Sequence, residues 1–596
     1  LLGRSIREPE QKQSLFDLPL RRIPAFSAAH DIQIEMHGQK ASSPLGPAAG
    51  PHTQLAQNIA LSWLAGGRII ELKTIQIKDE LIIPRPCIDM ATVGYNVEWS
   101  QELKLEQSLE EYVKASMLIE MLKQNPALSA LLPFGDTLFE VSIGYDLPGI
   151  QSERVGHFLH AIGNAADLVQ KLRRQIPDEL KQYRDLPFKE AIARSATIST
   201  FHGCPPGQIE EIAKHILQHY GYSCTLKLNP TLLGEKETNF ILHDMLGYHE
   251  IQIPGHAFEH DPSFEQIVPM IERLSNIAQS LGLGFGVKLT NTLVVQNHRN
   301  FFPSDQKEMY LSGPPLHVLA MHLVRKFRRA FGNRIPLSFS GGIDALNFPD
   351  AVALGLLPVT VCTDWLKTGG YARAHRYYEE LYARMNRCQA QSRSDFILRA
   401  YQGAENMAQS ALPLEQRLSE AIIRNTEQYV ESLAQNSRYA SPENTRAPKK
   451  IGKHLNLFDC IACDKCVPVC PNDANFVLSI KPAEIPLRKV KPSADGFEII
   501  EQGRLSLSER HQIANFIDFC NECGNCDVFC PEDGGPYHLK PRFFGSRKSF
   551  EDSPQLDGVF AEEHEGRRRI SGRFRGVLYQ LQMEGHQARY LGPGFE

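Results

Sequence analysis

The sequence lacks long hydrophobic runs, and no stretch of its 596 residues approaches the about 18 consecutive apolar residues of a membrane-spanning helix. Its N-terminal segment lacks the basic-then-apolar order of a secretory signal, so we expect a cytoplasmic chain. Neither sign of charge dominates, because the sequence has 64 Lys and Arg residues and 69 Asp and Glu residues, which gives a net charge of −5. This balance gives no overall attraction to nucleic acid or to an anionic membrane, and we expect neither as a partner.

Cysteines are few outside two short segments, which hold eight of the thirteen. A disulfide framework is typical of short secreted chains, whereas grouped cysteines in a large chain indicate metal binding. The scattered cysteines are Cys87, Cys204, Cys224, Cys362 and Cys388.

Short apolar runs alternate with helical patterns between residues 41 and 370, which is typical of βα units in an α/β protein. Eight such runs, mostly followed by helices, predict a (β/α)8 barrel with long insertions at 75–135 and 145–195. The runs are 43–50, 68–74, 138–144, 196–201, 224–229, 285–290, 336–342 and 359–365.

The remaining segments flank this barrel. We expect an irregular N-terminal lead-in before it, and after it a helical connector, a ferredoxin-like cysteine module and a C-terminal extension. The Arg-rich part of the extension is interpreted as a hairpin with a solvated or subunit-docking surface, and phosphate binding is the alternative. In chain order the five expected domains are 1–40, 41–370, 371–450, 451–540 and 541–596.

The two cysteine groups each have the pattern C-x2-C-x2-C-x3-C-P, which is the bacterial ferredoxin pattern for two [4Fe–4S] clusters. In that pattern the fourth cysteine of each group binds the cluster of the other group. Cluster one is therefore expected to take Cys460, Cys463, Cys466 and Cys530. Cluster two is expected to take Cys520, Cys523, Cys526 and Cys470.

Structural zinc is the alternative reading of these cysteines, but zinc sites typically use two C-x2-C pairs or include histidine. A segment of 49 residues, 471–519, separates the two groups. We expect this insertion either to shield a cluster or to face a partner.

The seventh predicted strand ends in Ser340-Gly341-Gly342-Ile343-Asp344, and the eighth ends in Cys362-Thr363. Loops after these two strands commonly bind phosphate in barrels, and glycines let backbone N–H groups approach an anion at a helix N-terminus. A tight turn without a ligand is the alternative.

Three lysines, Lys73, Lys227 and Lys288, lie at predicted strand ends, where a barrel interior normally holds apolar residues. Each would stabilise the negative charge of a reduced flavin, or would pair with a barrel carboxylate such as Glu71 or Glu140.

Several motifs carry a family resemblance: residues 69–88, Cys204-Pro205, LKLNPT (226–231), LTNTL (289–293), LSGPPL (311–316) and SGGID (340–344). They resemble the flavin domain of dihydropyrimidine and dihydroorotate dehydrogenases. A barrel followed by a double-cluster module is also the order in the C-terminal half of dihydropyrimidine dehydrogenase. With FHGCPPG (201–207) and KPRFFGSRKSFE (540–551), nearly the whole chain is similar to the YgfK-type selenate reductase subunits.

The resemblance implies an oxidoreductase with FMN in the barrel. It also implies that Cys204 is the general acid for a small-molecule substrate, although an inert buried thiol is the alternative. The implied FMN contacts are Ala48, Ala49, Lys73, Lys227, Gly313, Gly341, Gly342 and Thr363, and the implied substrate contacts are Asn291 and Thr292.

Two departures from that family bear on substrate and partner. Phe201, followed by His202 and Gly203, stands where the pyrimidine enzymes carry an asparagine, which disfavours a pyrimidine substrate. The sequence also lacks a G-x-G-x-x-G motif for FAD or NADPH. We therefore expect a redox partner subunit that binds FAD or NAD(P)H, or one of the molybdenum hydroxylase type.

Two other functions stay open at this point. In one, the barrel has lost its flavin and is a scaffold for a ferredoxin-like electron carrier in a larger redox complex. In the other, the chain is a maturation factor for a molybdenum or selenium enzyme.

Overall fold

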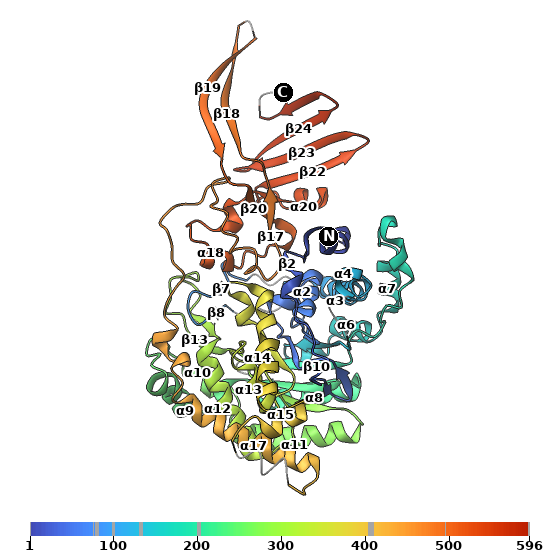
Figure 1. The fold of residues 1–596 in the computed structure, drawn as a ribbon, viewed down its shortest axis with the longest axis vertical. Helices are drawn as coiled ribbons and strands as arrows, with labels where there is room; N and C mark the ends of the chain where they lie inside the picture. Colours follow the sequence, from blue (N-terminus) through green and yellow to red (C-terminus); the bar gives the residue numbers. More distant parts are fainter. Residues whose placement is uncertain are drawn as a thin grey trace. The chain divides into compact units, whose positions relative to one another are not determined.

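The computed structural model describes residues 2–75, 77, 83–97, 102–129, 135–199, 204–402, 410–494 and 496–593. The chain divides into two compact units, Leu1–Ala447 and Pro448–Glu596 (Figure 1). Within those described ranges, no helix is long and apolar enough to cross a membrane.

The first unit contains a parallel barrel of eight strands in the order β5-β16-β15-β12-β11-β10-β9-β6. The backbone N–H of Arg68, just before β6, donates to the carbonyl of Leu45 in β5 at 2.8 Å, so the two ends of this order meet and the barrel is nearly closed. Each strand lies within or overlaps one of the eight predicted apolar runs, so the predicted (β/α)8 fold is confirmed. The strands are β5 (Leu45–Pro47), β6 (Ile69–Glu71), β9 (Leu138–Ile143), β10 (Ser195–Ser199), β11 (Ser223–Leu228), β12 (Phe285–Leu289), β15 (Leu337–Phe339) and β16 (Val359–Val361).

Helices follow most of these strands and cover the barrel. The strands are almost completely buried, because a parallel barrel is packed by side chains inside and by helices outside. The helix that precedes β12 begins with a capping box, in which the Ser263 hydroxyl accepts from the Gln266 backbone N–H. The covering helices include α2 (Ala56–Leu64), α8 (Pro206–His219), α11 (Phe264–Ser280), α12 (Pro314–Phe331), α13 (Phe348–Ala353) and α14 (Ala374–Arg387).

The segments inserted after β6 and β12 add a second, four-stranded sheet in the order β13-β14-β8-β7. Sequence analysis did not predict this sheet, because its strands are two to four residues long and pair distant segments, as Tyr310 does with Asn96. Its strands are β7 (Ile88–Asp89), β8 (Tyr95–Asn96), β13 (Leu293–Gln296) and β14 (Glu308–Leu311). The same insertion after β6 also forms helix α3 (Leu105–Leu122).

The N-terminal lead-in is more regular than predicted. Helix α1 (Leu2–Lys12) is followed by two short hairpins, so the prediction of an irregular segment is wrong. The buried Glu8 carboxylate accepts from Arg4 one turn earlier, at 2.7 Å, and from Ser14 at 2.8 Å. These contacts tie the helix end to the chain that follows. The hairpins pair β1 (Ser14–Leu15) with β2 (Leu18–Pro19) and β3 (Ile34–Met36) with β4 (Gln39–Ala41).

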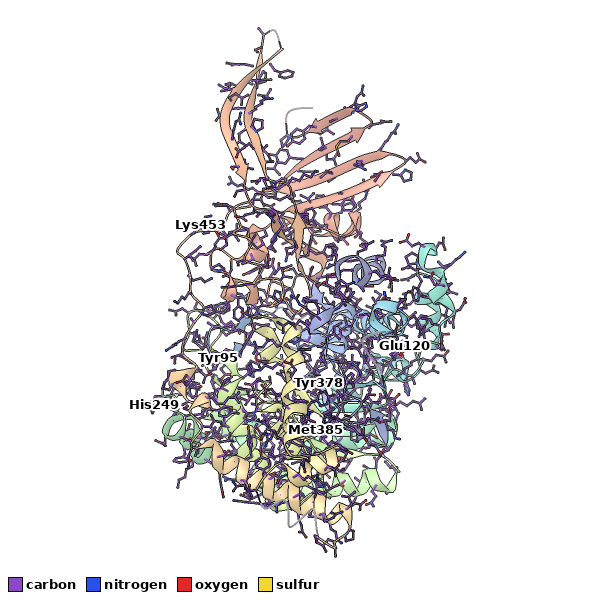
Figure 2. All side chains as sticks on the ribbon, in the orientation of Figure 1. Tyr95, Glu120, His249, Tyr378, Met385 and Lys453 are labelled. Atoms are coloured by element: carbon purple, nitrogen blue, oxygen red, sulfur yellow. The ribbon has the colours of Figure 1, made fainter. Side chains whose placement is uncertain are left out.

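The segment expected to be a helical connector forms α14, α15 (Arg393–Arg399) and α17 (Leu414–Leu433). These helices pack on the barrel within the first unit. The Tyr378 hydroxyl, labelled in Figure 2, donates to the carbonyl of Gly66 at 2.7 Å. The Asn425 amide donates to the carbonyl of Ala353 at 3.0 Å.

The second unit is built on a seven-stranded sheet in the order β17-β20-β21-β22-β23-β24-β25. Its four C-terminal strands form an antiparallel meander. The Arg-rich hairpin predicted for the C-terminal extension is β23 paired with β24. The strands are β17 (Asn475–Ser479), β20 (His511–Phe516), β21 (Arg542–Phe543), β22 (Gly558–His564), β23 (Arg567–Phe574), β24 (Val577–Glu584) and β25 (Gln587–Leu591).

The insertion between the cysteine groups contains a long hairpin of β18 (Ala483–Ser493) and β19 (Gly496–Leu507). Among the described residues these strands form a two-stranded sheet of their own, and every residue of β18 is exposed. The apolar side chains of Phe497 and Ile499 are 73% and 61% exposed. Such exposure fits the predicted role of facing a partner better than that of shielding a cluster.

Candidate active site and cluster ligands

A cavity of about 260 Å³ lies where the barrel strands end, and the inserted four-stranded sheet contributes to its wall. This is the edge of a parallel barrel at which ligands bind. Nine of the ten cofactor and substrate contacts implied by the resemblance line it. They are Ala48, Ala49, Lys73, Lys227, Asn291, Thr292, Gly341, Gly342 and Thr363.

The tenth residue, Gly313, does not line the cavity, but its carbonyl lies close to Gly342, which does. Gly313 and Gly342 have φ values of +75° and +53°, which favour glycine. A Cβ built on Gly342 would lie 2.2 Å from the Gly313 carbonyl oxygen, so the two loops approach too closely for a side chain. The expected helix N-terminus is not at this position, because α13 begins only at Phe348. Any anion at Gly341-Gly342 would therefore be bound by loop N–H groups.

The three barrel lysines have different environments. Lys288 forms a fully buried ion pair with Glu71, which is the carboxylate pairing considered from the sequence. Lys73 and Lys227 line the cavity instead. Burial lowers the pKa of Lys73 to about 8 and also lowers that of Lys227. An anion in the cavity would favour their charged forms.

The Glu71–Lys288 pair gives a prediction about stability. Replacing Lys288 with methionine removes the ammonium group that contacts the buried Glu71 carboxylate and leaves Lys227 as a more distant cation, so we expect the free energy of unfolding to fall by up to about 3–5 kcal/mol. The double variant Glu71→Leu with Lys288→Met removes both charges and is expected to be clearly more stable than K288M alone. Urea unfolding followed by tryptophan fluorescence measures both, because Trp63 and Trp365 are buried in the first unit. Equal stability of the single and double variants would contradict the pairing.

Glu140 gives a second prediction, about pH. Burial, and then the neighbouring Glu71 carboxylate, raise the pKa of Glu140 from 4.5 to about 7. The folded protein therefore binds this proton more tightly than the unfolded chain, and the free energy of unfolding falls as pH rises from about 4.5 to about 7. Glu140→Gln cannot titrate, so above pH 7 it is expected to exceed the parent protein in stability by roughly 3 kcal/mol.

The measurement is urea unfolding of both proteins at about pH 5 and about pH 8, followed by tryptophan fluorescence. The parent protein should lose stability between the two values, while E140Q should change less. The same pH dependence in both proteins would show that Glu140 does not titrate in this range.

A chain of hydrogen bonds fixes the polar side of the cavity. The Asn291 amide nitrogen donates to Asn229 Oδ1 at 2.7 Å, and the Asn229 amide nitrogen donates to the buried Asp261 carboxylate at 3.0 Å. Ser199 Oγ donates to Asn291 Oδ1 at 3.2 Å. Sequence reasoning missed Ser199, Asn229 and Asp261. Asn229 lies within the LKLNPT motif, but Asp261 has no local signal because it comes from a distant loop.

Cys204 is buried, and its thiol lies 3.6 Å from Gln208 Oε1. Burial, followed by the carboxylates of Asp261 and Asp146, raises the pKa of Cys204 to about 12, so the thiol keeps its proton at neutral pH. Cys204 is not among the described residues that line the cavity. Phe201, His202 and Gly203, where the sequence departs from the pyrimidine enzymes, lie outside the described residues.

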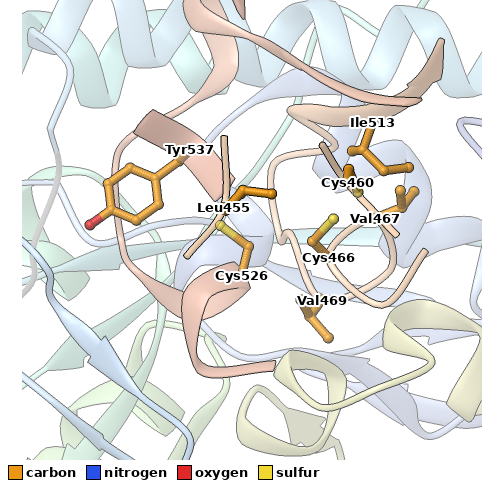
Figure 3. Close-up of a cluster of buried hydrophobic side chains, with 8 residues drawn as sticks. All are labelled: Leu455, Cys460, Cys466, Val467, Val469, Ile513, Cys526 and Tyr537. Carbon is orange, nitrogen blue, oxygen red and sulfur yellow. The ribbon is translucent and has the colours of Figure 1, made fainter. Parts of the chain in front are cut away.

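The eight motif cysteines gather in the second unit. Cys460, Cys466 and Cys526 lie in one buried cluster with Val469 and Tyr537 (Figure 3). The electrostatic neighbours of the Cys466 sulfur include Cys460, Cys463 and Cys530. Those of Cys526 include Cys523, Cys520 and Cys470, and also Cys466 of the other expected set. The members of each expected ligand set thus lie near one another, and the two sets meet between Cys466 and Cys526; the assignment of the ligands to two clusters stays a prediction.

The spacing and burial of the motif cysteines also fit iron–sulfur clusters. In the described part of the chain, no three Cys, His, Asp or Glu side chains are grouped to hold a single metal ion. A cubane differs from such a site because each of its thiolates binds a different iron atom, which places the thiolates farther apart. Burial raises the pKa of Cys470 to about 12, which makes the thiol harder to deprotonate. Binding to iron would offset the free-energy cost of deprotonation, because iron stabilises the thiolate.

Comparison with protein families decides the relationship of the chain. The family described as "Oxidoreductase YgfK, N-terminal TIM-barrel domain" matches residues 19–413, which is more than half of the chain. The chain belongs to the YgfK oxidoreductase family. The family described as "4Fe-4S dicluster domain" matches residues 456–533, which include all eight motif cysteines. The chain thus combines a TIM barrel of the YgfK family with a 4Fe-4S dicluster domain.

Among relatives, oxidoreductase YgfK of Escherichia coli strain K12 is 37% identical over 404 residues, which are 64% of this chain and 38% of the relative. The protein of the same name from E. coli O157:H7 gives the same values. The chain therefore spans less than half the length of the curated relatives it matches. The crystal structure of DHODH with ferulenol from Eimeria tenella aligns with 63% of this chain and 91% of that chain, at 17% identity and a TM-score of 0.40. A similarity this low carries no argument about the site.

Proposed function

We propose that the barrel binds FMN and that the dicluster domain holds two [4Fe–4S] clusters, so that the chain joins a two-electron reaction of a small molecule to one-electron transfer with a redox partner. The observation that carries this proposal is the cavity at the barrel strand ends. It combines two buried lysines with a pair of glycine loops, in the same chain as a 4Fe-4S dicluster domain.

The lining residues fit FMN chemically. FMN, when bound, can exchange electrons in pairs with a substrate and singly with clusters. Lys73 and Lys227 would stabilise negative charge on the ring system, because their ammonium groups lie in a buried site with a low effective dielectric. Backbone N–H groups of Gly341 and Gly342, with the Thr363 hydroxyl, would bind the phosphate.

Substrate-side roles follow from the hydrogen-bond chain. Asp261 accepts hydrogen bonds only, so it fixes the Asn229 amide with its nitrogen toward Asp261 and its oxygen toward the Asn291 nitrogen. Asn291 Oδ1 is then the acceptor end of the chain, where it accepts from Ser199 and would share this role with a substrate donor. A substrate with an N–H or O–H donor fits this arrangement. The neutral Cys204 thiol would hold the proton for a substrate carbon.

A redox partner completes the proposed function, because the clusters must exchange electrons with another protein or domain. We propose that this partner binds FAD or NAD(P)H or is of the molybdenum hydroxylase type. The partner exchanges one electron at a time with the dicluster domain, and two such transfers balance one substrate turnover.

Flavin binding is the direct test of the barrel's part. We expect apo-protein to bind FMN with quenched flavin fluorescence and to bind riboflavin much more weakly, because riboflavin lacks the phosphate that the loops of Gly341-Gly342 and Thr363 would hold. Equal affinity for FMN and riboflavin would contradict the proposed phosphate site. No binding of either would favour the flavin-free scaffold.

A further inference from the structure

The dicluster domain holds one buried lysine directly against a proposed cluster ligand. Lys540 follows the short helix α19 (Pro536–Leu539) and is 2% exposed. Its ammonium group donates a hydrogen bond to Cys460 Sγ at 3.0 Å. The same sulfur also accepts from the backbone N–H of Ala462 at 3.4 Å.

The charge of Lys540 acts on one ligand set. Its electrostatic neighbours are the sulfurs of Cys466, Cys460 and Cys530, which all belong to cluster one. Opposite charges at this distance favour the ammonium form, so the lysine remains a cation beside the thiolates.

Cluster two has a different environment among the described residues. The Cys470 sulfur accepts from a neutral donor, the backbone N–H of Ala474, at 3.3 Å. A cation, Arg542, lies near Cys520, but its side chain is 11% exposed and lies 3.9 Å from the Glu522 carboxylate. The carboxylate offsets part of the arginine charge, so Arg542 acts on cluster two less strongly than the sulfur-bonded Lys540 acts on cluster one.

Reduction adds one negative charge to a cluster, and charges and hydrogen bonds at its sulfurs set its potential. A buried cation stabilises the reduced form more than the oxidised form, and solvent screens a buried charge little. Because Lys540 lies beside cluster one, the reduction potentials of cluster one and cluster two should differ.

We propose that Lys540 raises the reduction potential of cluster one above that of cluster two, so that the first electron to enter the module resides on cluster one. This inference rests on the proposed function, because it requires that both clusters are present. It assigns an order to the two carriers: electrons leave cluster two for cluster one.

The test is an anaerobic redox titration followed by electron paramagnetic resonance, with iron and sulfide measured on each protein. In the parent protein we expect two separate one-electron waves, and the wave at higher potential should disappear in Cys530→Ser. In Lys540→Met, the ratio of reduced to oxidised cluster one at a fixed potential should fall at least tenfold. This corresponds to a decrease of at least about 59 mV in the reduction potential of cluster one, which is a one-electron couple.

Two matched variants separate charge from structure. Lys540→Arg keeps the cation and should restore most of the parent potential. Lys465→Met removes an exposed lysine next to Cys466 and should leave both potentials nearly unchanged, because water screens that charge.

Three outcomes would overturn the inference. One is equal potentials in the parent protein, and another is a higher wave that survives in C530S. The third is a fully loaded K540M protein with an unchanged potential. The first two need no Lys540 variant, so they stand even if K540M fails to load its clusters. Absence of iron and sulfide from the parent protein would instead refute the proposed function itself.

Discussion

Replacing Cys470 with serine is expected to remove the cluster bound by Cys520, Cys523 and Cys526, although Cys470 belongs to the other sequence motif. The iron content should fall from about eight to about four atoms per chain, because each cubane holds four irons and needs four thiolates. The structure supports this exchange: the Cys520 sulfur is a neighbour of the Cys470 sulfur, whereas Cys530 lies among the neighbours of Cys466.

Paired variants make this test specific. We expect Cys470→Ser and Cys526→Ser to leave the same paramagnetic signal after reduction, and Cys466→Ser and Cys530→Ser to leave the other. Cys388→Ser is the matched control, since Cys388 is a half-buried cysteine of the first unit outside both motifs. A Cys470→Ser protein with the same residual signal as Cys466→Ser would show that each motif holds its own cluster.

Replacing Lys227 with methionine is expected to weaken FMN binding roughly tenfold to a hundredfold. A hydrogen bond to a charged group contributes about 1.5–3 kcal/mol, and about 1.4 kcal/mol corresponds to a factor of ten. Lys227 is buried and lines the cavity, so solvent screens its charge little. The affinity is measured by titrating apo-protein with FMN and following flavin fluorescence.

Lys214→Met is the control for this experiment. Lys214 lies on α8 and pairs with Glu210 and Glu211 on the surface of the same unit. Its replacement removes the same charge without touching the cavity and should leave the affinity unchanged. Equal affinities of K227M and the parent protein would contradict a flavin role for Lys227 and would favour the scaffold hypothesis.

The barrel and the cysteine motifs were predictable from the sequence because their signals are local. Each barrel strand is an apolar run bounded by helical segments, and each cysteine motif fixes its own spacing. The lysines were predictable only in part. Their positions at strand ends showed that they needed charged partners, but only the packed barrel shows that Lys288 pairs with Glu71 while Lys73 and Lys227 line the cavity.

The features that sequence reasoning missed depend on contacts between distant segments. Strand β8 pairs with β14 across more than 200 residues, and neither strand is long enough to show a periodic pattern. Asp261 orients Asn229 from a loop about thirty residues away, and nothing near Asp261 in the sequence marks this contact. Lys540 likewise lies eighty residues from Cys460, and only the folded module shows that the two meet.

The most direct measurement is the content of iron, labile sulfide and acid-released flavin in one anaerobic preparation of the whole chain. We expect about eight irons and eight sulfides per chain, as two [4Fe–4S] clusters require, together with about one FMN. Colourless protein that contains zinc and no inorganic sulfide would contradict the electron-transfer function, and full iron loading without any flavin would contradict the catalytic role of the barrel.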